Sequence, residues 1–224
     1  IVPRFTERGI PLREARDYAV VGCVEIMLPG KSPARTMGHA INAAKCLELA
    51  LNDGKCALTG EQVGPRTGDP STFSSFDEVL DAFKRQLTYF TELALRVNIE
   101  AERYQPERIR FPFLSALTRD CVERGLDITC GGARFEFTGV NLANLADAAD
   151  GLAAIKSLVF DRKALTMAEL LDALRSNFEG KEPLRQLLLN RAPKYGCDEP
   201  EADGIAAEIV RHYVGVVGRH RTLR

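Results

Sequence analysis

Apolar and polar positions along the chain predict a helix-rich α/β protein. The segment Tyr18–Leu28 is an apolar, β-branched run followed by the turn pair Pro29-Gly30, and it is the best candidate for a strand. From Thr36 to Leu51 apolar side chains recur at helical spacing, and Asn52-Asp53-Gly54 supplies a stop signal. The first quarter of the chain therefore predicts a strand followed by a helix.

The longest predicted helix follows Ser75, which stands three residues before Glu78 at the spacing of a capping box. This helix is expected to end near Pro106. Its expected inward residues are Val79, Phe83, Leu87, Phe90, Leu93 and Val97. Further helices are expected at 113–122, 144–160, 166–180, 184–190 and 205–213, with a short strand at 133–137. Helix therefore dominates, with a minority of buried strand.

Composition excludes several classes of function. The chain has 224 residues and a formal net charge of -1, so no excess positive charge favours nucleic acid or an anionic membrane. No apolar run reaches the roughly 18 residues that a membrane helix needs, and Ile1–Ile10 carries charges where a signal peptide would be apolar. Six cysteines without a Cys-x-x-Cys pair and three histidines without zinc spacing favour reduced thiols, a cytoplasmic location and no metal site.

Cys23 and Glu25 form the most chemically suggestive pair. In a strand, residues two apart point to the same side, so the thiol and the carboxylate would share one surface. Burial within an apolar run would raise the pKa of Glu25 toward the range useful for general acid/base catalysis. A half-exposed strand, in which Glu25 faces water and Cys23 packs as a small hydrophobe, satisfies the same spacing.

Gly30-Lys31-Ser32 follows a predicted strand and precedes a predicted helix, which is the context of a phosphate-binding loop. That motif requires a second glycine five residues before Gly30, and this position holds Glu25, whose charge would repel phosphate. A solvated turn is therefore favoured over a nucleotide-binding module. His39, at the start of the predicted helix, could reach toward whatever the strand binds.

The segment Arg16-Asp17-Tyr18-Ala19-Val20-Val21-Gly22-Cys23-Val24-Glu25 resembles the active-site segment of glycyl radical enzymes, in their dehydratase and lyase branch. The resemblance continues to the last quarter of the chain and covers nearly all of it. Its other segments are 46–52, 67–70, 76–79, 112–118, 131–133, 152–156, 165–171 and 192–196.

The resemblance implies an α/β barrel of strands ringed by helices, with the Cys-x-Glu pair on a loop inside the barrel. Residues 1–224 would be an internal part of one pyruvate formate-lyase-like catalytic domain, without its N-terminal part and its C-terminal glycine radical domain. Part of the predicted strand would then be this loop. Cys23 would become a thiyl radical that abstracts hydrogen from the substrate, and Glu25 would be the general base.

Two departures from the family pattern bear on the substrate. Formate acetyltransferases use two adjacent cysteines, and here Gly22 precedes Cys23, which disfavours pyruvate cleavage. Some diol-dehydrating members carry a substrate-binding carboxylate about a dozen residues past the Cys-x-Glu pair, where this chain has Thr36, Met37 and His39; these three are the expected substrate-binding residues. The resemblance favours a lyase that breaks a carbon–oxygen, carbon–nitrogen or carbon–sulfur bond by radical elimination. An arylacetate decarboxylase is the alternative.

The resemblance also implies a radical stored on a glycine within an Arg-Val-x-Gly segment. The only Arg-Val pair is Arg96-Val97, followed by Asn98 and Ile99, so the storage glycine is expected outside this chain. No cofactor is expected within it. The expected partners are a small-molecule substrate, a radical-SAM activating enzyme that installs the radical, and a second copy in a homodimer of the full-length enzyme.

Overall fold

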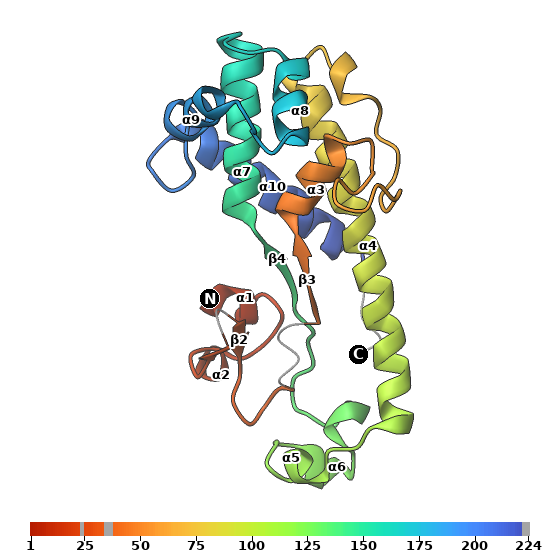
Figure 1. Cartoon of the computed structure of the whole chain (residues 1–224). Coiled ribbons are helices and arrows are strands. Elements are labelled where there is room, and N and C mark those ends of the chain that lie inside the picture. The colour runs from red at the N-terminus through yellow and green to blue at the C-terminus, as the bar shows by residue number, and fades with distance from the viewer. Residues whose placement is uncertain (23–24, 34–37, 221–224) are drawn as a thin grey trace. The chain divides into compact units, whose positions relative to one another are not determined.

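A computed structural model describes residues 1–22, 25–33 and 38–220 (Figure 1). The chain forms two compact units. Unit 1 comprises Ile1–Ala40, Ala94–Asn141 and the C-terminal residues from His220, and unit 2 comprises Ile41–Leu93 and Leu142–Arg219. Among the described residues, no helix is both long enough and apolar enough to cross a membrane.

Unit 1 holds a β-hairpin between short helices. Its elements are α1 (Val2–Thr6), α2 (Leu12–Ala15), β1 (Ala19–Val21), β2 (Glu25–Met27), α5 (Pro112–Ala116), α6 (Cys121–Arg124) and the 3-10 turn η2 (Ile128–Cys130). The core beneath the hairpin consists of Phe5, Ile10, Ala15 and Leu28, against which Ile26 and Phe137 pack. The apolar residues at the base of the hairpin thus attach it to the two N-terminal helices.

Unit 2 is a helical assembly around α7 (Leu145–Ala154). The other elements are α3 (Ala43–Ala50), the 3-10 turn η1 (Pro70–Thr72), the π-helix η3 (Ile155–Asp161), α8 (Met167–Arg175), α9 (Glu182–Arg191) and α10 (Pro200–Gly218). Figure 1 shows α7 beside both α3 and α10, the two helices against which it packs. Its Leu152 is completely buried, as are Phe83, Leu87 and Ile209. This helical core confirms the predicted dominance of helix.

Helix α4 (Phe76–Arg108) contributes its first half to unit 2 and its second half to unit 1. Val79, Phe83 and Leu87 are buried as predicted, whereas Leu93 and Val97 are 44% and 58% exposed, so the prediction is wrong there. The buried stripe continues instead through Thr91, Leu95 and Glu102, which are spaced four and seven residues apart. Because Thr91 and Glu102 are polar, the apolar periodicity of the sequence did not predict this stripe.

Two predicted helix starts carry the capping contacts that predicted them. The Thr166–Glu169 capping box is present, and Ser75 caps Glu78 while the Glu78 carboxylate accepts from the backbone of Ser74. The predicted helix 113–122 is interrupted, because Asp120 has a left-handed φ of 73° between α5 and α6. Residues 133–137, which were predicted to form a strand, do not form one. The strand in this region is β4 (Val140–Ala143).

The predicted helix from Thr36 begins only at Ala43. Residues His39–Asn42 form β3, which pairs with β4 in a two-stranded sheet. The side-chain oxygen of Asn42 caps α3 by accepting from the backbone N–H of Lys45 at 3.0 Å. Pairing with a strand that lies about a hundred residues later in the sequence overrides the local helical pattern.

Asp127 ties the segments around α5 together. Its carboxylate accepts hydrogen bonds from the backbone N–H groups of Phe111 and Thr129, at 2.9 and 2.8 Å, and from the hydroxyls of Ser115 and Thr129, at 3.0 and 2.7 Å. Burial acts to raise the pKa of Asp127, but these donors outweigh it and lower the pKa to about 2.

We predict that Asp127→Ala lowers the free energy of unfolding at pH 7 by on the order of 1–3 kcal/mol, because four donors lose their acceptor. A carboxyl group with a depressed native pKa stabilises the fold above its unfolded pKa, and this contribution is lost as the pH falls through the native pKa. In urea titrations the deficit of Asp127→Ala should therefore shrink between about pH 4 and pH 2. The exposed Glu123→Ala is the control, and an equal deficit at all pH values would contradict the prediction.

Candidate active site

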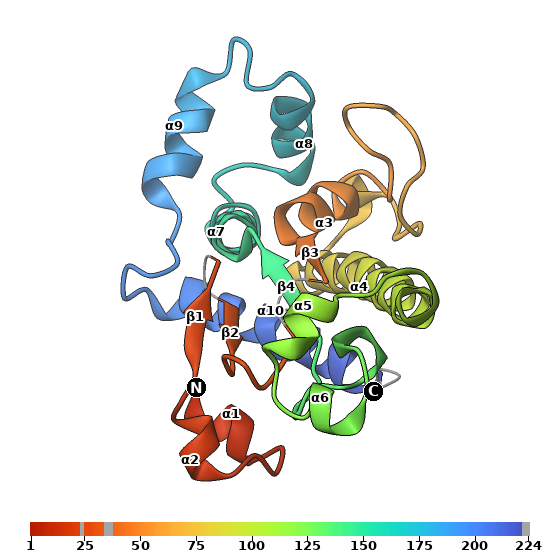
Figure 2. The same cartoon turned by 90° about the horizontal axis from the view of Figure 1, so that it is seen from below.

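The predicted strand at 18–28 is a hairpin. Strands β1 and β2 are antiparallel, with Ala19 opposite Met27 and Val21 opposite Glu25, and Figure 2 shows them side by side. Cys23 lies outside the described residues, so the expected shared surface of its thiol and the Glu25 carboxylate, and the expected loop around it, stay predictions.

Gly22 makes the hairpin possible in two ways. Its φ of 62° lies in the left-handed region, which a residue with a side chain rarely adopts. In addition, a Cβ atom at this position would lie 2.6 Å from Oε2 of Glu25. The carboxylate of Glu25 is thus folded back over the backbone of the residue that precedes Cys23.

The other carboxylate oxygen of Glu25 is bonded to a residue that sequence reasoning missed. The side-chain amide Nδ2 of Asn141, on β4, donates to Oε1 of half-buried Glu25 at 3.0 Å. No local pattern could have identified Asn141, because 116 residues separate it from Glu25.

Of the predicted substrate-binding residues, Thr36 and Met37 lie outside the described residues. His39 belongs to β3 rather than to a helix, and it is half-buried. Its ring nitrogen Nε2 is buried and has no hydrogen-bond partner among the described residues.

Gly30-Lys31-Ser32 is a turn, as favoured, but it is not solvated. Lys31 is only 7% exposed, and its ammonium group contacts the carboxylates of Glu14 and, at 2.6 Å, Asp17. The hydroxyl of Ser32 accepts from the Leu28 backbone N–H at 3.1 Å. Hydrogen bonds from Lys31 to Asp17 and then Glu14 raise the pKa of Lys31. These groups are committed to internal contacts, which argues against a nucleotide site.

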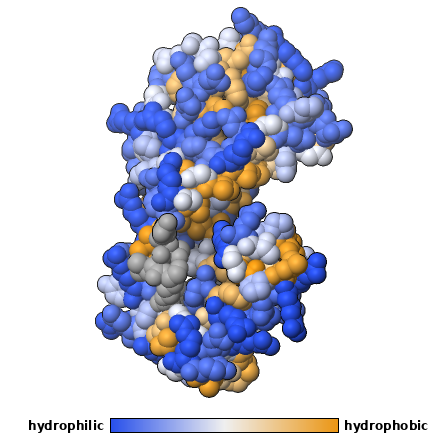
Figure 3. All heavy atoms as spheres, turned by 180° about the vertical axis from the view of Figure 1, so that it is seen from behind, coloured by the Kyte–Doolittle hydropathy of each residue, from blue (hydrophilic) through white to orange (hydrophobic). Residues whose placement is uncertain are grey.

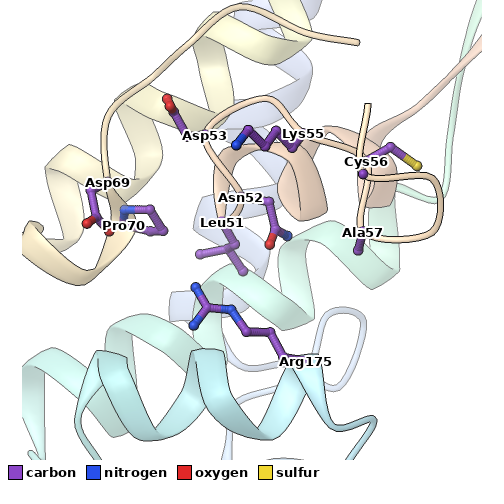
Figure 4. A pocket seen from close by; sticks show the side chains of 10 residues that line it. Leu51, Asn52, Asp53, Lys55, Cys56, Ala57, Asp69, Pro70 and Arg175 are labelled. Atoms are coloured by element: carbon purple, nitrogen blue, oxygen red, sulfur yellow. The ribbon is translucent and has the colours of Figure 1, made fainter. Parts of the chain in front are cut away.

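A cavity lies in unit 2, and Figure 4 shows Asn52, Asp69 and Arg175 among its lining residues. The side chain of Cys56 is directed away from Arg175 in this view. Hydrogen bonds from the backbone of Thr59, then from Lys45, whose Nζ lies 3.1 Å from the sulfur, lower the pKa of Cys56 to about 7. The carboxylate of Asp53 accepts from the Thr67 backbone and so serves the loop itself. In the described part of the chain, no group of three or more His, Cys, Asp or Glu side chains is arranged to hold a metal ion.

Comparison with known proteins identifies the family of the chain. The family model described as pyruvate formate lyase-like matches residues 1–224, so the chain belongs to this family, and the resemblance to glycyl radical enzymes is confirmed. A trans-4-hydroxy-L-proline dehydratase from Clostridioides difficile is 38% identical over 220 residues, covering 98% of this chain and 28% of the dehydratase. A (2S)-3-sulfopropanediol dehydratase from Klebsiella oxytoca is 38% identical over 219 residues, covering 97% of this chain and 26% of that protein.

The solved structures give the same result. A hydroxyproline dehydratase from Clostridioides difficile, with trans-4-hydroxy-L-proline bound, is similar to this chain with a TM-score of 0.92 and 37% identity; the match covers 99% of this chain and 28% of that one. The helix-rich α/β arrangement is therefore that of part of a glycyl radical enzyme. The chain spans little more than a quarter of the length of these curated relatives.

We predict that Gly22→Ala displaces the Glu25 carboxylate and lowers turnover of the complete enzyme by roughly 10²-fold, because Glu25 is the expected general base and a shift of about 1 Å in such a group would have that effect. Gly9→Ala is the matched control, since Gly9 also has a left-handed φ, of 78°, but no atom lies within 4 Å of the added Cβ. Crystal structures and turnover rates of the two variants provide the comparison. Equal losses in both would attribute the effect to backbone strain alone.

Proposed function

We propose that residues 1–224 are an internal part of the catalytic domain of a glycyl radical lyase, which eliminates a group from a small substrate. The observation that supports the proposal is the hairpin in which Val21 pairs with Glu25 and the Glu25 carboxylate lies against Gly22, the residue that precedes Cys23 in the sequence. The two curated relatives described above are dehydratases, which supports elimination over decarboxylation. In the complete enzyme this hairpin would lie inside the barrel that the family resemblance implies.

Cys23 would carry the hydrogen-transfer step. Its thiyl radical takes a hydrogen atom from a substrate carbon, so that an S–H bond forms as a C–H bond breaks. After elimination the product radical takes this hydrogen atom back, and the thiyl radical is regenerated. The transfer requires sulfur and carbon to be held at roughly 3 to 3.5 Å, away from other hydrogen donors.

Glu25 would act on the substrate radical as general base. It takes a proton from the hydroxyl on the radical carbon, which weakens the neighbouring carbon–oxygen bond. That bond breaks, and the departing hydroxyl takes the proton from Glu25 and leaves as water. The sum of the steps is loss of one water from the substrate, with Cys23 and Glu25 returned to their initial states.

The remaining parts of the site would select the substrate. The buried ring nitrogen Nε2 of His39 has no hydrogen-bond partner within the described part of the chain, which suits contact with a polar group of the substrate. Thr36 and Met37 complete the proposed pocket. The stored radical would be installed by a radical-SAM activating enzyme on a glycine outside residues 1–224, and the complete enzyme would be a homodimer. When present, that glycyl radical supplies the unpaired electron for Cys23.

The proposal is tested by substrate profiling of the complete, anaerobically activated enzyme against hydroxylated, amino and sulfonated compounds. Formation of an elimination product is the expected result. Release of carbon dioxide from an arylacetate, with no elimination product, would replace the proposal with the decarboxylase alternative.

We predict that Cys23→Ala abolishes this turnover, because the proposed hydrogen-transfer role belongs to one sulfur. Cys46, Cys56, Cys121, Cys130 and Cys197 should each tolerate Ser or Ala with activity largely retained. Cys56→Ser is the sharpest control, since a thiol with a pKa of about 7 is partly ionised at neutral pH. Turnover by Cys23→Ala would end the radical-lyase proposal.

We predict that Glu25→Gln lowers kcat by two to four powers of ten, the usual contribution of a general base, because glutamine keeps the size and loses the basicity. The exposed Glu123→Gln serves as the control for loss of one carboxylate. The glycyl radical yield, measured by electron paramagnetic resonance, should be unchanged in both variants. A wild-type rate in Glu25→Gln would leave Glu25 with a structural role only.

A further inference from the structure

We propose that Asn141 is a positioning residue that fixes the Glu25 carboxylate for proton transfer. The inference rests on the proposed role of Glu25 as general base and adds a residue to which neither the family motif nor the sequence pattern assigns a function. Asn141 acts through Glu25 and is not itself proposed to react.

The contacts give the two carboxylate oxygens different surroundings. Oε1 accepts from Asn141 Nδ2 at 3.0 Å, whereas Oε2 lies over Gly22, the residue before Cys23. A carboxylate can rotate about its last side-chain bond, and this torsion has no sharp intrinsic preference. The bond from Asn141 favours one orientation, in which Oε2 lies against Gly22.

Asn141 is well held for this purpose. It lies within β4, which pairs with β3, and the backbone N–H of Gly38 donates to the carbonyl of Gly139 at 2.8 Å just before the paired strands. Asparagine also has a short side chain, so its amide follows the backbone closely. A base supported from a paired strand is held more accurately than one on a free loop.

The donor also affects the charge state of Glu25. A hydrogen bond donated to a carboxylate favours the ionised form, which is the form that accepts a proton. Removing the donor takes one restraint from the orientation of the carboxylate and disfavours its base form. Because each effect requires Glu25, neither operates when residue 25 cannot act as a base.

The test is a double-mutant cycle in the complete, activated enzyme. Asn141→Leu removes the donor and keeps a side chain of similar size. It should lower kcat roughly tenfold, the usual contribution of one such hydrogen bond, and leave KM little changed. The acidic limb of the pH–rate profile should move to higher pH. In the Glu25→Gln background, Asn141→Leu should have no further effect. Asn141→Asp, which places a second carboxylate beside Glu25, should lower kcat further than Asn141→Leu; the control Asn190→Asp adds the same charge at an exposed position of α9.

Two results would overturn the inference. One is an equal loss from Asn141→Leu in the wild-type and Glu25→Gln backgrounds, which would show that Asn141 does not act through Glu25. The other is a crystal structure of Asn141→Leu with the Glu25 carboxylate in its original position. This structural readout does not depend on catalysis. If the Glu25 carboxylate is displaced in Asn141→Leu, Asn141 keeps its positioning role. If Glu25→Gln also shows a wild-type rate, Glu25 loses its proposed function as general base.

Discussion

The pairing of Val21 with Glu25 is the constraint on which the site depends. Gly22, which follows Val21, has a left-handed φ of 62°. Only glycine adopts this conformation at no steric cost, and only glycine leaves room for the carboxylate of Glu25 above it. Gly22 and Glu25 are thus linked by backbone geometry.

The base of the hairpin is fixed by two kinds of contact. Leu28 is completely buried among Phe5, Ile10 and Ala15, so hydrophobic burial holds the end of β2. Just beyond it, buried Lys31 contacts Glu14 of α2 and Asp17 before β1. Such a buried charge adds little net stability but allows few alternative arrangements, because any displacement leaves it unpaired. The segment that resembles a phosphate-binding loop in sequence is therefore an anchor for the hairpin.

The thiol of Cys56 suits a chemistry other than the one proposed for Cys23. A cysteine that exchanges hydrogen atoms must carry its hydrogen, which favours the neutral thiol. Cys56, with its sulfur surrounded by donors and a pKa of about 7, is instead partly a thiolate at neutral pH and suits ionic chemistry. A lowered pKa therefore does not mark Cys56 as a candidate for the radical role.

The sequence by itself determined the family, the helix-rich composition and the local signals that need only neighbouring residues. The Thr166–Glu169 capping box and the buried residues Val79, Phe83 and Leu87 belong to this group. Only the tertiary structure decided what depends on distant partners. His39–Asn42 pairs with β4 and is a strand, where a helix was predicted. Lys31 is buried in an ion pair with Asp17. Asn141 donates a hydrogen bond to Glu25, 116 residues away in the sequence. The physical reason is that capping and periodicity act within one or two turns of the chain, whereas strand pairing, burial and side-chain hydrogen bonds are settled between segments that the sequence separates.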